Sequence, residues 1–192
     1  LEALLETGTT LVSYDVGAAR RFCDAHCKGP SGGSLRTRIA DRWARDDPAA
    51  ALTWLAEAPA DQETDSAVSV TYAVWASRDS AGAIRWMKER IERHASGETP
   101  RWLELTLPIY ARLLAADSPG EGLAVAARLK DPHERTAVLV ELAHAWYHER
   151  DPAAAEAWLR GSPLDEASRA IVRSPERPVI ESRERESDGA QS

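Results

Sequence analysis

The sequence predicts an all-α protein, an α-solenoid of about five antiparallel helical hairpins. Three observations lead to this fold class. The 192-residue chain is rich in alanine and carries seven tryptophans, a composition that suits closely packed helices. A segment recurs along it every 32 to 39 residues, and helical hairpins commonly recur at such a period. No run of alternating β-branched residues competes with helix, apart from Val68–Val74, which the repeat assigns to a helix.

The repeat is clearest in three segments, each with an aromatic residue four positions before an Asp and a Trp seven positions after it. Two weaker copies fit the same frame. The anchor residues of the five copies are Asp15, Asp47, Asp79, Ser118 and Asp151. Each anchor carries a side-chain oxygen that can accept a hydrogen bond from the first turn of a helix, and Pro follows it in three copies. We therefore expect every anchor to cap the second helix of its hairpin.

Each second helix is expected to pack through a small residue next to a large one. The position four residues after the anchor is always Ala or Gly, and the position three further on is a large residue, Trp in three copies. Residues three or four apart share a helical face. The small residue would let the two helices approach closely while the large one fills the space beside it. The small residues are Ala19, Ala51, Ala83, Gly122 and Ala155, and the large ones are Phe22, Trp54, Trp86, Val125 and Trp158.

The first helix of four of the hairpins is expected in the apolar-periodic segment before the anchor, at Ser34–Arg45, Ser66–Ser77, Trp102–Ala115 and Arg135–Glu149. Breaks rich in Gly, Pro and Ser separate the units. The predicted domain covers residues 1–173, with units at about 3–28, 34–58, 66–95, 102–130 and 135–161 and a capping helix at 165–172. Residues 174–192 have the composition of a disordered tail. The wider spacing before Ser118 predicts an insertion near Glu92–Pro100.

Charge and hydropathy bear on the class of partner. The formal net charge is −7, which argues against a nucleic-acid binder because phosphates are captured by clustered positive charge. No stretch is apolar for long enough to predict a transmembrane helix. The chain opens with Leu1, and its basic residues are 21 Arg and 3 Lys. We expect a bacterial protein from which a signal or anchor segment was removed, so the periplasm is slightly favoured over the cytoplasm.

The units resemble tetratricopeptide repeats, and related short Sel1-type repeats also fit. The resemblance covers about residues 3–163 and rests on an Ala-x-x-Trp element, an Ala-x-x-x-Trp element and a later Pro. These are Ala40–Trp43, Ala50–Trp54 and Pro59 in one copy, and Ala143–Trp146, Ala154–Trp158 and Pro163 in another. The Trp that opens the family's first helix is missing here, its Gly is Ala, and the gap from Trp43 to Ala50 is two residues shorter than in the family.

The resemblance implies a right-handed superhelix that binds a protein partner on a concave surface lined by first helices. It implies a non-catalytic scaffold, or an accessory subunit of a larger assembly such as a membrane-associated complex. The expected groove residues form a weakly polar set without the Lys/Arg cluster that would recognise a terminal carboxylate. They are Thr37, Asp41, Arg45, Ser69, Ala73, Ser77, Arg112 and Ala116, together with His144 and His148 near the far end.

Two clusters suggest a metal site as the alternative function. The first is Cys23, His26 and Cys27, whose spacing could place three ligands on adjacent helical turns. Cys23 stands in the repeat column of Leu55 and Met87, so a buried apolar role is favoured over a metal site or a disulfide with Cys27. An i, i+4 disulfide would also be expected to distort the last turn of the helix, because the Cα separation of such a pair in an intact helix lies near the upper edge of disulfide geometry.

The second cluster is Glu141, His144 and His148, which share one face of a first helix. This spacing does not match a known metalloprotease motif, so histidines at the groove or its rim are the favoured interpretation. The motifs of serine hydrolases, phosphate-binding loops and dinucleotide-binding sites are also missing from the sequence. We therefore expect neither an enzyme nor a bound cofactor.

Overall fold

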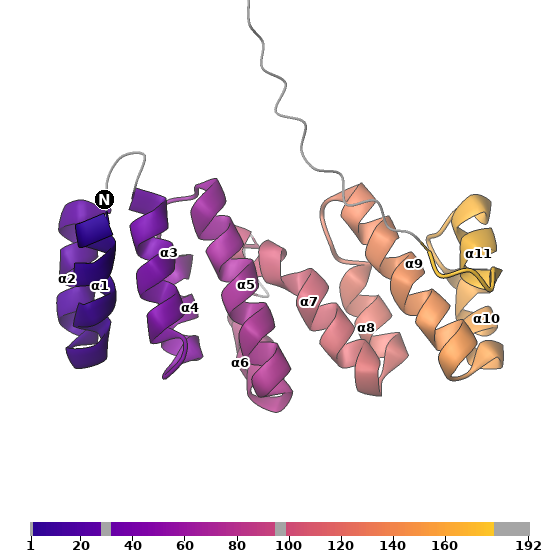
Figure 1. Ribbon diagram of the computed structural model, residues 1–192. Coiled ribbons are helices and arrows are strands. Elements are labelled where there is room, and N and C mark those ends of the chain that lie inside the picture. Colours follow the sequence, from indigo (N-terminus) through magenta and orange to yellow (C-terminus); the bar gives the residue numbers. More distant parts are fainter. Residues whose placement is uncertain (1, 28–31, 95–98, 179–192) are drawn as a thin grey trace, which may run out of the picture.

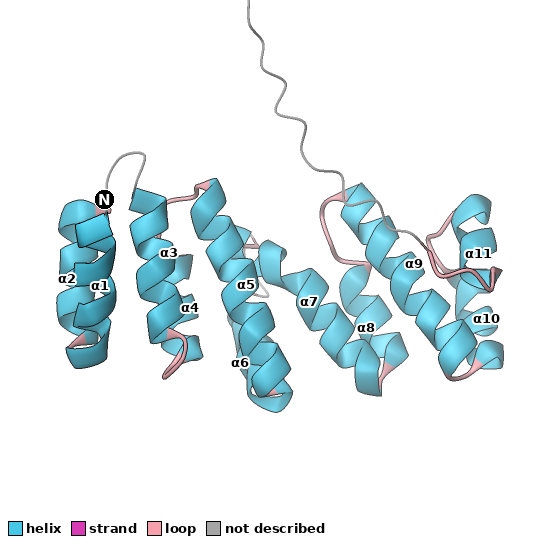
Figure 2. Cartoon of the chain, in the orientation of Figure 1, coloured by secondary structure: helices cyan, strands magenta, loops and turns pink. Residues whose placement is uncertain are grey.

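The computed structural model describes residues 2–27, 32–94 and 99–178, and within these ranges it contains eleven helices and no strand (Figure 2). The all-α prediction is confirmed for this part of the chain. The helices are α1 (Glu2–Tyr14), α2 (Val16–His26), α3 (Gly32–Trp43), α4 (Pro48–Ala56), α5 (Gln62–Arg78), α6 (Ser80–Arg93), α7 (Arg101–Asp117), α8 (Pro119–Ala126), α9 (Pro132–Glu149), α10 (Pro152–Gly161) and α11 (Glu166–Arg173).

The helices follow one another as pairs in a row (Figure 1). We call α1, α3, α5, α7 and α9 the first helices and α2, α4, α6, α8 and α10 the second helices. The two helices of a pair are joined by one to four residues and contact each other. Each first helix also contacts the next first helix, and α2, α4, α6 and α8 each contact the first helix that follows. The core therefore runs along the row, shared between neighbouring pairs.

Aspartates cap the second helices, as the repeat predicted. The carboxylates of Asp15, Asp47, Asp79 and Asp151 each accept a hydrogen bond from the backbone N–H three residues later. The prediction is wrong for Ser118, which occupies the N-cap position of α8 but makes no capping hydrogen bond with its side chain. A second set of capping aspartates, which the repeat analysis missed, begins α5, α9 and α11; these are Asp61, Asp131 and Asp165.

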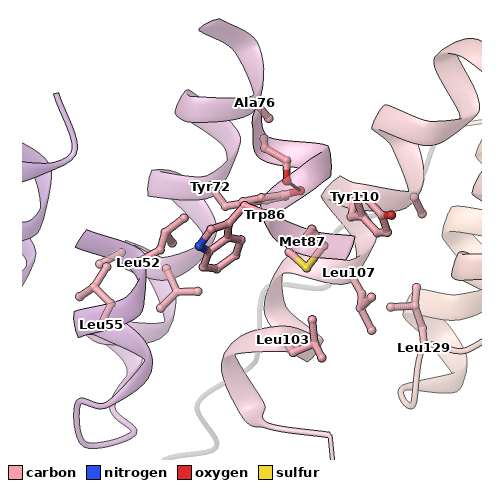
Figure 3. Close-up of a cluster of buried hydrophobic side chains, with 14 of the residues drawn as sticks. Leu52, Leu55, Tyr72, Ala76, Trp86, Met87, Leu103, Leu107, Tyr110 and Leu129 are labelled. Atoms are coloured by element: carbon pink, nitrogen blue, oxygen red, sulfur yellow. Dashed lines mark hydrogen bonds between the residues drawn. The ribbon is translucent and has the colours of Figure 1, made fainter. Parts of the chain in front are cut away.

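The small-residue column lies at the centre of each pair. Ala19, Ala51, Ala83 and Ala155 are fully buried. The Tyr72 hydroxyl of α5 donates to the carbonyl of Ala83 at 3.2 Å, a contact that requires close approach of α5 and α6. Figure 3 shows Tyr72 beside Trp86 in this core.

The tryptophans divide into two groups. Trp43, Trp54 and Trp86 are 8% exposed and belong to the core. Trp75, Trp102, Trp146 and Trp158 are only half-buried and pack against its edge. Among the large residues expected beside the small column, Trp54 and Trp86 are therefore buried in the core, whereas Trp158 is half-buried.

The structure describes the predicted capping segment in full and only the first residues of the expected tail. The predicted capping segment lies in α11, which packs on α9 and buries Val172 completely. The first five residues of the expected tail, 174–178, are not helical, and residues 179–192 lie outside the described residues. Part of the predicted insertion, residues 95–98, also lies outside them, while Glu92 and Arg93 belong to α6.

Two glycines of α8 provide a matched test of helix packing. A Cβ atom added at Gly122 would lie 2.6 Å from the Ala111 carbonyl oxygen and 2.6 Å from the Ala115 Cβ atom, both on α7. A Cβ atom added at Gly120 would meet nothing within 4 Å. We expect Gly122→Ala to lower the free energy of unfolding by about 1–3 kcal/mol through overpacking. Gly120→Ala should be neutral or stabilise by up to about 1 kcal/mol. Urea denaturation measures both values, and equal effects of the two substitutions would contradict this packing.

Candidate functional site

The residues predicted to line a groove lie on the first helices, except Arg45, which lies in the turn after α3, and two of them lie in the seams between neighbouring helices. The Thr37 hydroxyl of α3 donates to the carbonyl of Glu63 at 3.4 Å. The Ser69 hydroxyl of α5 donates to the carbonyl of Asp65 at 3.2 Å and reaches that of Leu105 at 3.5 Å. These hydroxyls link α3 to α5 and α5 to α7, and both residues are half-buried.

The other predicted residues of the second, third and fourth units are exposed, namely Asp41, Arg45, Ala73, Ser77, Arg112 and Ala116. Their charged groups have partners within the chain. Arg45 pairs with Asp41 one turn earlier at 3.0 Å. Arg112 forms a two-pronged contact with Glu141 of α9, with nitrogen–oxygen distances of 2.6 to 3.1 Å. The hydrogen bond with Glu141 raises the pKa of Arg112, so this guanidinium stays charged and is committed to the junction between α7 and α9.

An exposed apolar stripe on α5 went unnoticed in the repeat analysis. Val70 is 57% exposed and Val74 is 42% exposed, one helical turn apart, with exposed Ala73 between them. The apolar run Val68–Val74 was the sign of this stripe in the sequence. Val68 is buried on one side of α5, so Val70 and Val74 fall on the opposite, exposed side. A helix with apolar residues on two faces buries one of them and leaves the other available to a partner.

The stripe continues onto α7. Relative to their anchors, Ile109 and Leu113 of α7 occupy the same two positions as Val70 and Val74 of α5, and both are half-buried. Because α5 and α7 contact each other along the row, these equivalent positions lie on the same side of two neighbouring first helices. We call Val70, Ala73, Val74, Ile109 and Leu113 the central apolar patch.

The histidine cluster is not arranged as a metal site. The His144 Nε2 atom lies 3.1 Å from the Ser174 carbonyl oxygen, and the His148 Nε2 atom lies 3.0 Å from that of Val172. The third candidate ligand, Glu141, is held by Arg112. The prediction that both histidines belong to an open groove is wrong for His144, which is 8% exposed. They hold the end of α11 and the residue after it against α9.

The cysteine cluster forms a disulfide. Cys23 and Cys27 are bonded, with their Cα atoms 4.8 Å apart, whereas four residues of regular helix span about 6 Å. The favoured interpretation of Cys23 as an unbonded buried residue is therefore wrong, although its burial, at 3% exposed, is confirmed. α2 ends at His26, whose ring packs on Phe22 with centroids 4.5 Å apart. Among the described residues, no group of three His, Cys, Asp or Glu residues is placed to hold a metal ion.

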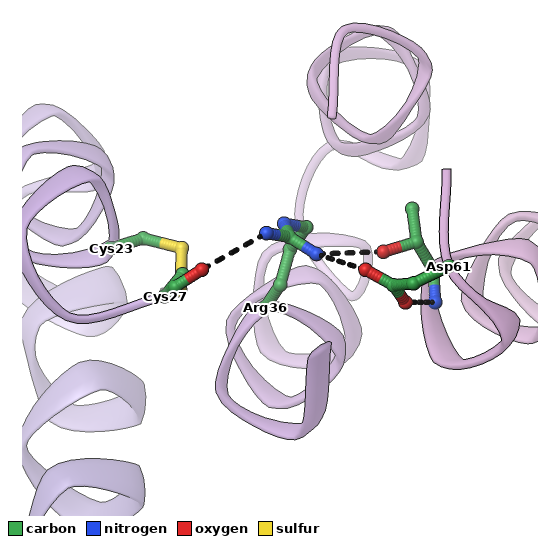
Figure 4. Close-up of a disulfide and its surroundings, with 5 residues drawn as sticks. Cys23, Cys27, Arg36 and Asp61 are labelled. Atoms are coloured by element: carbon green, nitrogen blue, oxygen red, sulfur yellow. Dashed lines mark hydrogen bonds and ion pairs between the residues drawn. A yellow bond between two sulfur atoms is a disulfide. The ribbon is translucent and has the colours of Figure 1, made fainter. Parts of the chain in front are cut away.

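A buried arginine connects this disulfide to the next two units (Figure 4). Arg36 of α3 is 5% exposed and donates to the Cys27 carbonyl at 3.3 Å. Its other terminal nitrogen donates to Asp61 at 3.0 Å and to the Thr64 hydroxyl at 2.7 Å, at the start of α5. No sequence motif predicts this bridge, because its members lie on three different helical units.

A pocket of about 450 Å³ lies on the second-helix side of the row, and no motif had pointed to it. Residues of α2, α4 and α6 and the last residue of α3 line it. Its aromatic wall consists of Trp43, Trp54 and Trp86, and its charged residues include Arg20, Glu57 and Arg90. Trp43 and Trp54 pack against each other with ring centroids 5.9 Å apart.

Comparison with known proteins returns nothing: no family model, no curated protein and no solved structure matches the chain. None of the helices in the described ranges is both long enough and apolar enough to cross a membrane.

The Arg36 bridge predicts a pH-dependent contribution to stability. Burial raises the pKa of Asp61, but hydrogen bonds from Thr64 and the charge of Arg36 outweigh it and leave this pKa below its ordinary value of 3.8. The stabilisation is therefore fully present above about pH 5 and is lost as the pH falls through the depressed pKa. Asp61→Asn keeps a good N-cap and removes the charge. We expect it to lower the free energy of unfolding by about 1 kcal/mol at pH 7.

Urea denaturation between pH 7 and pH 3 measures this difference, which should shrink below pH 4 because the wild-type carboxylate becomes protonated. Asp46→Asn is the control, since Asp46 pairs with Arg42 at an exposed position. A constant difference for Asp61→Asn over the whole range would contradict an ionic contribution from this residue.

Thiol labelling tests directly whether Cys23 and Cys27 form a disulfide or bind a metal ion. Denatured protein prepared without reductant should contain no thiol that reacts with iodoacetamide, and after reduction both cysteines should react. Mass spectrometry of the intact protein measures the added groups. Two reactive thiols before reduction, protected only when zinc is present, would instead support a metal site at Cys23 and Cys27.

Proposed function

We propose that the chain is a non-catalytic interaction scaffold, or an accessory subunit of a larger assembly, built as a tetratricopeptide-like α-solenoid. The pattern of contacts supports a solenoid, because the main contacts of each pair of helices, among the described residues, are with its neighbours in the row. The period, the small-residue column and the short turns within pairs support the tetratricopeptide likeness. A protein partner would bind across the exposed side of the first helices.

The central apolar patch is the observation that carries this proposal. Isolated exposed apolar residues are ordinary, but a contiguous patch on a folded surface is typical of an interaction site. The patch lies in the middle of the row, and the charged group beside Leu113, Arg112, is already paired with Glu141. A partner could thus bury apolar area there without separating an uncompensated charge from water.

We further propose that the protein works in an oxidising compartment, for which the bacterial periplasm is the candidate favoured by the sequence. The support is the Cys23–Cys27 disulfide, because structural disulfides persist mainly outside the reducing cytosol. A partner in this compartment could belong to a membrane-associated complex.

Placing charge on the patch should abolish partner binding without unfolding the protein. In Val70→Glu with Val74→Glu, two carboxylates replace exposed side chains, and Glu is a better helix former than Val. The measurement is co-purification from native extract, with partners identified by mass spectrometry and stability checked by thermal denaturation. We expect a specific protein to be recovered with wild type and reduced at least about tenfold with the variant.

Tyr14→Glu is the matched control, because Tyr14 is a large apolar residue that is 86% exposed at the end of α1, away from the patch. It should recover the partner as the wild type does. Equal recovery with all three proteins would contradict binding at the patch. Sedimentation velocity would reveal whether the partner is a second copy of this chain.

A further inference from the structure

The pocket between α2, α4 and α6 contains a cation, Arg90, that forms no ion pair within 4 Å with any described residue; the adjacent Glu89 pairs instead with Arg93. Arg90 of α6 forms no ion pair there, whereas Arg20 across the pocket lies 3.7 Å from Glu57. The remaining acid of the pocket wall, Asp47, accepts the capping hydrogen bond of α4. Each carboxylate of the pocket therefore has another partner, and Arg90 is the group left to attract an anion.

Arg90 is held in place by contacts that leave most of its donors unused. One terminal nitrogen donates to the Thr53 hydroxyl of α4 at 3.1 Å. The guanidinium carbon lies 5.2 Å from the centre of the Trp86 ring, a cation–π contact. Burial, followed by the nearby charge of Arg93, lowers the pKa of Arg90, and the opposing charge of Glu89 offsets this only in part, so this cation lacks the solvation that an exposed arginine has. A guanidinium has five N–H donors, and a carboxylate can accept two of them at once.

The repeat shows that this arrangement is particular to one junction. Arg90 stands eleven residues after its anchor, where the other units have His26, Ala58, Leu129 and Ser162. Thr53 stands six residues after its anchor, where the others have Arg21, Arg85, Ala124 and Ala157. A large residue recurs at the repeat position of Trp54 and Trp86, because the packing of the helices requires it in several units. The Thr53–Arg90 pair occurs at one junction only, so packing of the repeat does not require it.

We propose that this pocket binds an apolar side chain of a partner protein that has a carboxylate beside it. The apolar group would lie against Trp54 and Trp86, and the carboxylate would accept hydrogen bonds from Arg90. The pocket is open to solvent rather than enclosed. A small molecule usually needs most of its surface buried, so an open pocket suits one or two side chains of a larger partner whose remaining surface supplies further contacts. This site lies on the second-helix side, and the inference does not depend on the central apolar patch.

Selection from a library of random heptapeptides displayed on phage tests the proposal on the folded full chain. We expect the selected peptides to contain Asp or Glu next to an aromatic or large aliphatic residue. A synthetic peptide of the selected sequence should shift the indole N–H signals of Trp54 and Trp86 in NMR spectra. Replacing its acidic residue by the corresponding amide should weaken binding by about tenfold to a hundredfold, as expected for loss of a charged hydrogen bond.

Substitution of the protein provides the matched comparison. Arg90→Gln should weaken the selected peptide by about the same factor, while Arg85→Gln, an exposed position of α6 outside the pocket wall, should leave the affinity unchanged. Thermal denaturation confirms that both variants are folded, and Arg90→Lys should restore part of the binding because it keeps the charge. If Arg90→Gln did not fold, the amide-substituted peptide on wild-type protein would decide the question.

Several outcomes would overturn the proposal. These are selected peptides without an acidic residue, no saturable binding of any peptide up to about 1 mM, and equal weakening by Arg90→Gln and Arg85→Gln. Binding of a free apolar carboxylate such as indole-3-acetate, with the same dependence on Arg90 but without binding of acidic peptides, would assign the pocket to a small molecule instead.

Discussion

Close approach of two helices at a small residue is the constraint on which every hairpin depends. Ala51, Ala83 and Ala155 are fully buried at the same place in three units, and at Gly122 even a methyl group would collide with α7. Second helices of eight to fourteen residues are too short to be stable alone in water. They remain helical because this contact brings the backbones together and lets the large residue beside it fill the adjoining space.

The same constraint explains why the turns within pairs are so short. Asp15 alone joins α1 to α2, and Asp79 alone joins α5 to α6. Such a residue must leave the helical conformation to reverse the chain and must also satisfy the first N–H groups of the next helix. An aspartate in the extended region does both, because its carboxylate reaches the N–H three residues later. In α8 the Pro that follows Ser118 has no N–H to satisfy, and the helix forms without a side-chain cap.

Sequence reasoning succeeded where the signal is local and failed where it depends on a neighbouring unit. The capping aspartates and the small column are set by residues within one hairpin, so the repeat revealed them. The partners of Arg36, Arg112 and His144 lie about 25 to 30 positions away. A repeat alignment gives the face on which such a residue lies, but it does not give the group that the next helix places opposite. The disulfide was missed for another reason, since its 4.8 Å Cα separation requires the helix to end at that point.

These contacts within the chain also determine which side chains remain on the surface for a binding partner. Several polar side chains of the first helices bind the first helix of the next unit, as Thr37 does with Glu63 and Arg112 with Glu141. At the end of the row, α11 covers part of α9. An apolar patch at Val70 and Val74 therefore remains exposed on the first-helix side of the middle units. On the second-helix side of the same units, Arg90 forms no ion pair with any residue that the structure describes. Both features lie at positions that the packing of the repeat leaves unconstrained, so the middle of the row can vary in chemistry while its ends and seams maintain the fold.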